Sequence, residues 1–590
     1  MSDITFQIIA IGLYFAAMIA IGVYAARKTT DHEDYMLGGR NLNPFTAALS
    51  AGASDMSGWL MLGLPGAIYA AGLIEAWIAI GLTIGAFLNW QFVAPRLRAY
   101  TEVSNNSITI PSFFENRLRD RTRLLRLVAG VVILVFFTFY VSSGMVAGGV
   151  FFEASFGVDY TLGMLLVAGV TLSYTLFGGF LGASFTDVVQ GMMMFLALII
   201  IPIMAFVAVG GLGGVQSGIE ASGAELTGLF PADLDGMAVI GIVSALAWGL
   251  GYVGQPHIIV RFMALKDVHA AKAGRNIGIS WMVISLIGAV ISGFVGIAYV
   301  QQNGITLDNP ETVVLVMAQA LLHPFVAGLV LAAVVAAIMS TISSQLIVSS
   351  SALVEDLFQV FTKERPSQKL LVILGRACVL AVAIIAGLLA LNPSDTILGL
   401  VGFAWAGFGA AFGPIVLLSL YWRKLTNWGA LAAMIVGAAT VFIWDAIEKA
   451  NTVDGGIAPG FEIFSLYEIV PGFLLALVVA VVVSLFTYKH SAAIDDEFTQ
   501  TGSMVALGNR GAAQTAGHPS ATASADRNVL PRSGTGRPVA ADRTRGGAES
   551  TWCSRRLRRL GSRACRLSRA RVDRARWRRP RAAGGRRTRS

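Results

Sequence analysis

Long apolar segments alternate with short polar segments from residue 5 to residue 488. A membrane-spanning helix needs about 20 mainly apolar residues to cross the hydrocarbon core, and each apolar segment has about that length. The pattern therefore predicts an all-α polytopic membrane protein with 13 transmembrane helices. The predicted spans are residues 5–26, 45–64, 68–93, 126–152, 160–177, 187–211, 238–257, 273–301, 323–351, 368–391, 397–421, 427–446 and 467–488.

The basic residues of the loops are sorted to one side of this arrangement. Of the 22 Lys and Arg residues that precede residue 503, 20 lie in loops on one side of the predicted membrane. The other side has Lys449, and Arg376 lies inside the tenth span. Because basic loops stay in the cytoplasm, the pattern predicts an outside N-terminus and a cytoplasmic C-terminus, in a bacterial-type cytoplasmic (inner) membrane.

Composition supports a membrane protein and argues against other classes. Only 13% of the residues are charged, about half the share found in a soluble globular chain. The three cysteines, Cys378, Cys553 and Cys565, form neither a disulfide framework nor a metal-binding spacing. The first apolar segment has no basic region before it and no cleavage site after it, so we interpret it as a span rather than a signal peptide.

The second span is interrupted by a polar stretch, SAGASDMSGW, at residues 50–59. Gly52 and Gly58 weaken the helix, and Asp55 is an ionisable group within the membrane, where such groups are costly and usually functional. Non-helical backbone is tolerated there where it lines a cavity or is buried in protein. The stretch therefore predicts a site for a small hard cation such as Na⁺ and for a substrate. A close-packed Gly/Ser helix face explains the small residues but not Asp55.

The seventh span has a second interruption, WGLGYVGQPHIIVRF, at residues 248–262. Its glycines and Pro256 disfavour one straight helix, and Trp248, Tyr252 and His257 supply aromatic surface and hydrogen-bonding groups. Taken alone, these features are equally typical of a simple kink. Interruptions at corresponding positions of two halves indicate the binding site of an inverted-repeat transporter. Since the broken spans are five apart, spans 2–6 and 7–11 are predicted to form inverted repeats.

The ninth span contains clustered hydroxyl side chains within AAIMSTISSQLIVSSS, residues 336–351. Most of them have an ordinary explanation, because a helix satisfies such hydroxyls with carbonyls one turn back. Ser340 and Thr341 lie about one turn after Ala337. One helix face therefore offers two hydroxyls and a carbonyl that could complete the shell of a cation.

These three patches resemble proline-transporting members of the sodium:solute symporter family. The resemblance runs from about residue 5 to about residue 490 and includes LSAGASDMSGWLMLGLPGA (49–67), GLGYVGQPHIIVRFMA (249–264) and AAIMSTISSQL (336–346). It implies a LeuT-type 5+5 inverted repeat with one preceding and two following helices. It also implies a transporter rather than an enzyme, which couples Na⁺ movement to uptake of L-proline by alternating access.

The resemblance assigns roles to individual residues. Na⁺ is expected at the carbonyls of Ala53, Met56 and Ala337 and at the hydroxyls of Ser340 and Thr341. Sodium coupling is expected of Asp55, Arg40 and Asp187, although Asp187 at the start of the sixth span is nearly as typical of a solvated helix-start acid. The proline site is expected at Ser57, Gly58, Tyr140, Trp248, Tyr252, Pro256 and His257.

The resemblance also defines the expected ligands. Na⁺ is the coupling ion, without an organic cofactor, and one Na⁺ site implies a 1:1 ratio of Na⁺ to proline. L-proline, Na⁺ and membrane lipid are the expected partners, with no nucleic acid and no obligate protein partner. Two alternatives remain: a Na⁺-coupled symporter for another small solute, such as pantothenate, and a transporter-like sensor.

The predicted organisation has five segments. They are residues 1–44 (first helix and cytoplasmic loop), 45–211 (first repeat), 212–421 (second repeat), 422–490 (two peripheral helices) and 491–590 (a disordered, Arg-rich cytoplasmic tail). Residues 503–590 hold 22 Arg and no Lys. Such aperiodic sequence predicts disorder and is typical of out-of-frame translation of GC-rich DNA, so the tail is assigned no function. The outside loop 302–322 is expected to form a surface helix over an entrance or an ordinary connecting helix.

Overall fold

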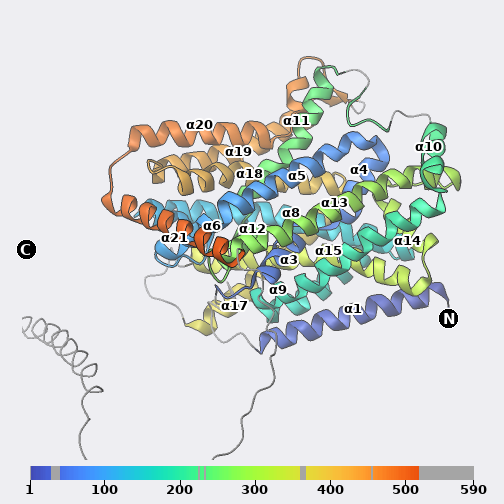
Figure 1. The fold of residues 1–590 in the computed structure, drawn as a ribbon, viewed down its shortest axis with the longest axis horizontal. Coiled ribbons are helices and arrows are strands. Elements are labelled where there is room, and N and C mark those ends of the chain that lie inside the picture. The colour runs from blue at the N-terminus through green and yellow to red at the C-terminus, as the bar shows by residue number, and fades with distance from the viewer. Residues whose placement is uncertain are drawn as a thin grey trace, which may run out of the picture. The chain divides into compact units, whose positions relative to one another are not determined.

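The computed structural model describes residues 2–27, 40–222, 226–231, 234–358, 367–453 and 456–516, and these residues are mostly helical. Figure 1 shows long helices packed side by side, with α1 (Asp3–Ala26) along one edge of the bundle. Within the described residues, 11 helical segments are long and apolar enough to cross a membrane. The chain is therefore a multi-pass membrane protein.

The long helices form most of the bundle. One of them is a compound helix, in which α5 (Ala76–Leu88) continues through the π-helical turn η4 (Asn89–Val93) into α6 (Ala94–Val103). Besides this helix and α1, the long helices are α8 (Leu124–Phe156), α9 (Tyr160–Ala208), α11 (Gly236–Gly251), α13 (Ala270–Gln302), α15 (Pro324–Ser351), α17 (Gln368–Ala390), α18 (Ile397–Tyr421), α19 (Asn427–Ala450) and α20 (Ile469–Thr487).

Short elements connect these helices. They are η3 (Leu73–Glu75), α7 (Ile110–Leu118), α10 (Gly211–Ser222), η6 (Pro310–Thr312), α14 (Val313–Leu321), η7 (Ala352–Phe358), the antiparallel pair β1 (Thr452–Val453) and β2 (Gly456–Ile457), and η8 (Glu462–Ser465).

The helix α9 changes direction near its middle. Gly179 has φ 55° and ψ −157°, a conformation outside the helical region that favours glycine. At 1.5 Å per residue, a helix of this length would extend about 74 Å if it were straight, well beyond the roughly 30 Å hydrocarbon core. The kink therefore separates two helical halves, which the sequence analysis predicts as two spans.

The first predicted break occurs where the sequence places it. The helix α3 (Pro44–Asp55) ends at Asp55, and Met56 leaves the helical region with ψ 83°. The chain resumes as a π-helical turn, η2 (Trp59–Gly63), and then α4 (Leu64–Ala71). A Cβ at Gly58 would lie 2.8 Å from Cβ of Ala147 in α8, so glycine permits the close approach of the break to that helix.

The second break divides the seventh predicted span. A short 3₁₀ turn, η5 (Tyr252–Gly254), ends α11, and α12 (Pro256–Met263) begins with proline at its first position. Proline lacks the N–H that would continue α11, and it favours extended backbone at the preceding residue. Gln255 accordingly has φ −78° and ψ 109°.

The two broken segments are joined at one end by backbone hydrogen bonds. The N–H of Leu42 donates to the carbonyl of Ala264 at 3.1 Å, and the N–H of Lys266 donates to the carbonyl of Leu42 at 3.1 Å. Leu42 and Leu265 thus form a parallel bridge. The chain entering α3 and the chain leaving α12 are therefore fixed to each other.

The loop 302–322, which was expected to form a surface helix or a connecting helix, contains two short helical elements that pack against the bundle. Its second half forms η6 and α14, and Val313, Leu315 and Met317 of α14 are buried. The Glu311 carboxylate accepts hydrogen bonds from the N–H groups of Ile397 (3.1 Å) and Leu398 (3.2 Å). It thereby caps the positive N-terminal end of α18.

The prediction of disorder from residue 491 onward does not hold for its first part, because residues 492–516 form the helix α21 (Ala492–Ala516). This helix lies beside α6 (Figure 1). Phe498 is buried, with its ring 4.9 Å from the guanidinium of Arg96 and 5.1 Å from that of Arg423. The remaining residues of the predicted tail, 517–590, lie outside the described residues.

Candidate functional site

A buried carboxylate connects the two helix breaks. Asp55 is 1% exposed at the end of α3. The hydroxyl of Tyr252, in the break between α11 and α12, donates a short hydrogen bond to Oδ2 of Asp55. The indole Nε1 of Trp59 donates to the Asp55 main-chain carbonyl at 3.0 Å. The second break thus holds the side chain of this residue, and the segment that follows the first break holds its backbone.

Oxygen atoms of the first break lie against the hydroxyl cluster of α15. Oγ of Ser340 lies 2.7 Å from the carbonyl oxygen of Ala53 and 2.9 Å from that of Ala337. Oγ1 of Thr341 lies 3.3 Å from the same Ala337 carbonyl. The structure therefore brings together four of the five residues expected to bind Na⁺. Met56, the fifth, is buried and directly follows α3.

This oxygen set has the chemistry that a small hard cation requires. It contains uncharged carbonyl and hydroxyl oxygens at a break in a membrane helix, where freed carbonyls commonly coordinate Na⁺ in transporters. The Ser340 hydroxyl can direct its lone pairs toward a cation by rotating about its C–O bond. The arrangement thus fits Na⁺ without a change in the fold of α15.

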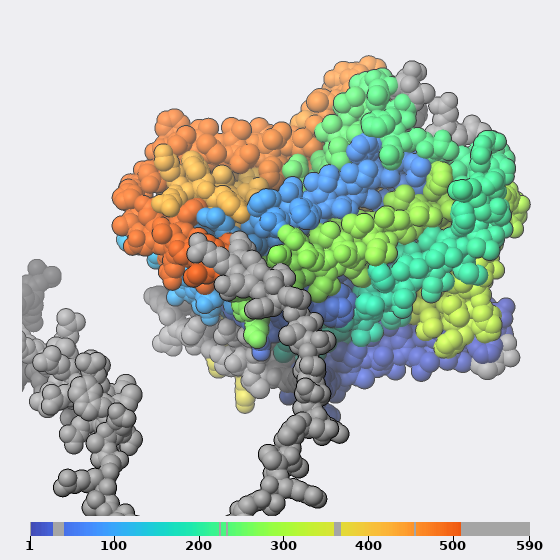
Figure 2. All heavy atoms as spheres, viewed as in Figure 1, coloured from blue at the N-terminus to red at the C-terminus, as the bar shows by residue number. Residues whose placement is uncertain are grey.

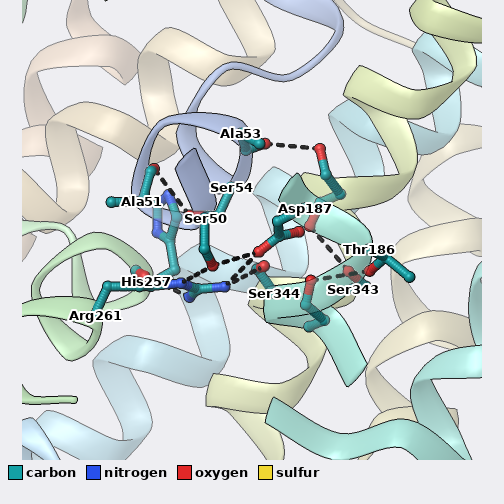
Figure 3. A network of polar contacts seen from close by, with 12 residues as sticks. Ser50, Ala51, Ala53, Ser54, Thr186, Asp187, His257, Arg261, Ser343 and Ser344 are labelled. Carbon is teal, nitrogen blue, oxygen red and sulfur yellow. Dashed lines mark hydrogen bonds and ion pairs between the residues drawn. The ribbon is translucent and has the colours of Figure 1, made fainter. Parts of the chain in front are cut away.

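A buried ion pair lies beside the oxygen set (Figure 3). Nη2 of Arg261 lies 3.2 Å from Oδ2 of Asp187, and both side chains are inaccessible to solvent. The same guanidinium donates to Oγ of Ser50 (3.1 Å), Oγ of Ser344 (2.6 Å) and the carbonyl of His257 (2.5 Å). Ser50 in turn donates to Oδ2 of Asp187 at 2.6 Å.

This network joins four parts of the chain: Ser50 in α3, Asp187 in α9, Arg261 in α12 and Ser344 in α15. The solvated helix-start interpretation of Asp187 is excluded, because the residue lies inside α9 and is fully buried. Breaking the pair would leave a buried charge without a partner, which is costly. The network therefore holds these four helices in their present arrangement.

Aromatic side chains pack around the second break. The Trp248 ring is stacked with the rings of Trp405 and Tyr467, at centroid distances of 6.3 and 5.5 Å. Nε1 of Trp405 donates to the Trp248 carbonyl at 2.7 Å. A Cβ at Gly251 would overlap this indole, so the contact requires glycine there.

The remaining expected proline-site residues lie at the two breaks, except Tyr140, which lies within α8. The rings of Tyr140 and His257 meet edge to face at a centroid distance of 5.8 Å. Both ring nitrogens of His257 lack a hydrogen-bond partner among the described residues. Ser57 follows the end of α3, and its Oγ lies 3.4 Å from the N–H of Trp59. Gly58 and Pro256 begin the helical segments that follow the breaks.

Arg40 lies at the junction of the broken segments rather than beside Asp55. Its Nη1 donates to Oγ1 of Thr101 (3.1 Å) and lies 3.5 Å from the carbonyl of Met263, the last residue of α12. Its Nη2 donates to the carbonyl of Ser107 at 2.5 Å. The guanidinium therefore ties the entry to α3 to the end of α12.

A large cavity of about 1100 Å³ reaches the aromatic cluster. Trp248 and Tyr467 line it together with Glu468 and Lys449. The cavity thus reaches Trp248, in the part of α11 that precedes the second break, and is lined by both acidic and basic side chains.

A family model described as the sodium:solute symporter family matches residues 35–437. The chain belongs to the sodium:solute symporter family. This membership makes it a transporter of the symporter type rather than an enzyme. The family assignment was expected from the three polar patches, and it is confirmed.

Three relatives are similar to this chain over most of its length. The high-affinity proline transporter PutP of Bacillus subtilis (strain 168) is 54% identical over 481 residues, covering 82% of this chain and 98% of the relative. The osmoregulated proline transporter OpuE of the same strain is 52% identical over 486 residues, covering 82% and 96%. The sodium/proline symporter of Staphylococcus aureus (strain JH9) is 48% identical over 504 residues, covering 84% and 96%.

A solved structure supports the fold of this symporter-family chain. The substrate-bound outward-open state of a Na⁺-coupled sialic acid symporter aligns with a TM-score of 0.68. The alignment covers 82% of this chain and 98% of the other, at 19% identity. The two chains therefore share a helical, LeuT-like transporter fold.

The sequence analysis did not predict three residues that lie at the site. Arg261 was counted among the loop charges, although it lies in the buried part of α12. Trp405 lies within a continuous apolar span, where one more aromatic residue is inconspicuous. Asn89, which donates to the Tyr252 carbonyl at 3.0 Å, is a single amide at the end of a predicted span. Arg261 and Asn89 are polar residues within apolar sequence, and this feature could have indicated their place at the site.

Proposed function

We propose that this protein is a secondary active transporter that couples inward Na⁺ movement to uptake of L-proline by alternating access. The observation that carries the proposal is the junction of two broken helices, where Tyr252 of the second break bonds to Asp55 of the first, and Ser340 of α15 bonds to the Ala53 carbonyl. Relatives named as proline transporters, at 48–54% identity over most of the chain, support the same substrate.

Na⁺ is proposed to bind at Ala53, Met56, Ala337, Ser340 and Thr341. The ion would take the place of the hydrogen bonds by which the Ser340 and Thr341 hydroxyls now reach the carbonyls of Ala53 and Ala337. Its charge favours the C-terminal end of α3, where the helix dipole is negative. Asp55 is the last residue of this helix and adds a full negative charge.

Proline is proposed to bind between the two breaks, at Ser57, Gly58, Tyr140, Trp248, Tyr252, Pro256 and His257. Its carboxylate is attracted by the positive N-terminal end of α12, which begins at Pro256. Its ring and secondary ammonium can contact the aromatic faces of Trp248 and Tyr140. The large cavity that reaches Trp248 provides a route of entry.

Coupling follows from the order of residues along the first break. Na⁺ bound at Ala53 and Met56 would order the backbone immediately before Ser57 and Gly58. The proline contacts would then be formed in advance, so that each ligand raises the affinity for the other. Each Na⁺ that moves inward also gains about 2.3 kcal/mol per 100 mV of membrane potential.

The finer architecture is part of this proposal. We infer 13 transmembrane helices: the 11 long segments, with α9 counted as two at its kink and the broken pair α3 and α4 counted as a further one. Spans 2–6 and 7–11 would form the 5+5 inverted repeat, with one preceding and two following helices. The loop charges support an outside N-terminus and a cytoplasmic C-terminus in the inner membrane.

Uptake of radiolabelled L-proline into proteoliposomes, with and without an inward Na⁺ gradient, tests the function. We expect uptake that depends on Na⁺ and that is lost in Asp55→Ala. Asp496→Ala, which removes an exposed carboxylate of α21 far along the chain from both helix breaks, is the control and should retain uptake. A folded wild-type protein that takes up no proline would refute the substrate and direct the search to other small solutes.

A further inference from the structure

An apolar groove of about 320 Å³ lies between α5 and α13 at the surface of the bundle. Figure 2 shows these two helices side by side on the face toward the viewer. Among the described residues that line the groove, Thr83 alone has a polar side chain, and its hydroxyl donates to the Ala79 carbonyl at 2.8 Å. Ile84 of α5 and Ile287 of α13 are each 52% exposed. The groove therefore offers hydrocarbon surface without a free side-chain hydrogen-bonding group.

The size and chemistry of the groove suit a hydrocarbon chain. An apolar cavity of about 150 Å³ can hold a benzene ring, and this groove is larger. An amino acid or an ion would leave its polar groups unsatisfied there, which is costly. Both helices belong to segments long and apolar enough to cross the membrane. The groove is therefore open to lipid acyl chains rather than to water.

A basic side chain lies at one end of the same helix pair. Arg275 is in the second turn of α13, about 12 Å along the helix axis from Val283, the first groove residue of that helix. Its guanidinium donates to Oε1 of Gln91 and lies over the Phe87 ring, 5.5 Å from the centroid. Phe87 and Gln91 continue the α5 side beyond the groove residue Ile84. Arg275 therefore bridges the two helices at the end of the groove.

The positive charge at this end is not balanced by a carboxylate. Among the described residues, Arg275 contacts uncharged side chains and forms no ion pair. Lys272 lies one turn earlier on the same helix face and is exposed. Asp267, the nearest acid in the sequence, accepts a hydrogen bond from the N–H of Ala270. Because the helix dipole is also positive here, this end of α13 favours an anionic group.

The spacing of the groove and the basic end matches one phospholipid. A lipid reaches from its headgroup to the middle of the hydrocarbon core, about 15 Å, which exceeds the distance from Arg275 to the groove. The loop charges place this end of α13 in the cytoplasm, where the membrane surface carries anionic lipids. We infer that α5 and α13 form a binding site for one anionic phospholipid of the cytoplasmic leaflet, with its phosphate at Arg275 and Lys272 and an acyl chain in the groove.

The inference goes beyond the proposed function and takes from it only the membrane orientation. Its consequence for the protein follows from the opposite face of α13. There a Cβ at Gly52 of α3 would lie 2.6 Å from the Trp281 ring, and Nε1 of Trp281 donates to the Gly191 carbonyl at 3.1 Å. A lipid that fills the groove would hold α13 in place against the first helix break. Since such a lipid binds the folded protein, it should raise stability.

The test is thermal unfolding of the purified, delipidated full-length protein in detergent at increasing concentrations of dioleoyl phosphatidylglycerol or dioleoyl phosphatidylcholine. The anionic lipid should raise Tm in a saturable manner and at a lower concentration than the zwitterionic lipid. Arg275→Gln should raise the phosphatidylglycerol concentration for half-maximal stabilisation by about fivefold, as loss of one basic group near anionic lipid does. Lys489→Gln removes an exposed basic residue outside the groove and is the control. It should leave that concentration unchanged.

Two further ligands separate the headgroup from the chain. Dihexanoyl phosphatidylglycerol has the same headgroup, but its chains are too short to extend from Arg275 into the groove, so it should stabilise the protein less. Inorganic phosphate should have no effect. Equal stabilisation by phosphatidylcholine or by inorganic phosphate would overturn the site. A dimer that Ile84→Arg dissociates would assign the groove to a second copy and overturn it as well.

A conservative variant keeps the inference testable if Arg275→Gln does not fold. Arg275→Lys keeps the charge and should retain the preference for phosphatidylglycerol, whereas Lys272→Gln should weaken it. A preference that survives the removal of both charges would refute the site. Because stability is measured without proline, loss of the lipid effect in a protein that transports proline would refute this site alone. A lipid effect in a protein that does not transport proline would refute only the proposed function.

Discussion

The hydroxyl of Tyr252 donates a hydrogen bond to the carboxylate of Asp55, and 197 residues separate the two in the chain. One residue belongs to the break after α3 and the other to the break after α11. The contact joins the two interruptions directly. A change that moves either break will therefore change the surroundings of Asp55, through which the proposed ion and substrate sites communicate.

Tyr252→Phe tests this contact, because it removes the hydroxyl and keeps the ring. Oδ2 of Asp55 would lose its hydrogen bond while it remains buried, a loss of about 1–3 kcal/mol. We expect the Na⁺ concentration for half-maximal proline uptake to rise by about tenfold. Tyr421→Phe is the matched control, since the Tyr421 hydroxyl donates to the Phe92 carbonyl at an exposed position. Equal Na⁺ dependence in both variants would contradict a role for the contact in ion binding.

Two serines of α15 that lie close together in sequence should respond differently to substitution. Oγ of Ser340 contacts the Ala53 carbonyl across the helix interface, whereas Oγ of Ser343 donates to the Ser340 carbonyl within its own helix. We expect Ser340→Ala to raise the Na⁺ concentration for half-maximal uptake by about 10- to 100-fold, as loss of a metal-site oxygen does. Ser343→Ala should change it less than threefold. Initial uptake rates measured at increasing Na⁺ concentrations give this value for both variants. A larger effect of Ser343→Ala than of Ser340→Ala would refute the proposed Na⁺ site.

The buried ion pair predicts a specific pattern of stability. Asp187→Leu alone should destabilise the protein by about 3–5 kcal/mol, because it leaves the Arg261 charge buried without a partner. The double variant Asp187→Leu/Arg261→Met should recover most of this loss, since neither charge remains. Lys449→Ala removes an exposed pair and should cost less than about 1 kcal/mol. Thermal unfolding in detergent measures the stability of these three variants. A double variant that is less stable than Asp187→Leu alone would argue against this electrostatic account.

We expect the substitution of Gly251 by alanine to weaken substrate binding. A Cβ in Gly251→Ala would overlap the Trp405 indole, and such overpacking costs about 1–3 kcal/mol. The displaced indole would lose its hydrogen bond to Trp248, so the KM for proline should rise by about tenfold. The control is Gly236→Ala on the same helix, because a Cβ at Gly236 would have no heavy atom within 4 Å. An unchanged KM in Gly251→Ala would separate the aromatic cluster from the proline site.

The C-terminal helix defines where the chain can be shortened. Truncation after Thr501 removes the Arg-rich sequence but keeps Phe498 and the ion pair between Arg119 and Glu497. We expect uptake to be intact in this variant. Phe498→Ala should lower thermal stability, because the ring is buried among arginines. Loss of uptake at normal expression after truncation would show that the removed sequence has a role.

The broken helices could be predicted because polar and helix-breaking residues stand out within apolar segments. Asp55, Ser340 and Pro256 were found this way, and their chemistry indicated the type of site. Which residues meet across the bundle could not be predicted, since a periodic pattern gives the face of a helix but not its partner. The contacts Tyr252–Asp55 and Arg261–Asp187 therefore required the structure. The family resemblance pointed to the main-chain oxygen of Ala53, whereas helix periodicity already placed that of Ala337 beside Ser340 and Thr341.

The helix α21 shows a different limit of sequence reasoning. Its sequence is only weakly apolar, so composition favours disorder over a packed helix. The structure holds it through a few specific contacts, chiefly Phe498 and Glu497 with surrounding arginines. Those arginines were interpreted only as determinants of membrane orientation. Where an arginine both sets the membrane orientation and contacts α21, its position in the sequence indicates only the first of these roles.

The parallel bridge between Leu42 and Leu265 has a consequence for biosynthesis. A membrane protein emerges from the ribosome in sequence order, with its N-terminal parts folding first. The chain before α3 is synthesised long before residues 264–266, so its backbone groups at Leu42 must stay hydrated until the second broken helix has been inserted. The junction of the two broken segments is consequently completed late during translation, and nascent chains that stop before residue 264 contain Leu42 but lack Ala264 and Lys266, whose backbone groups hold it.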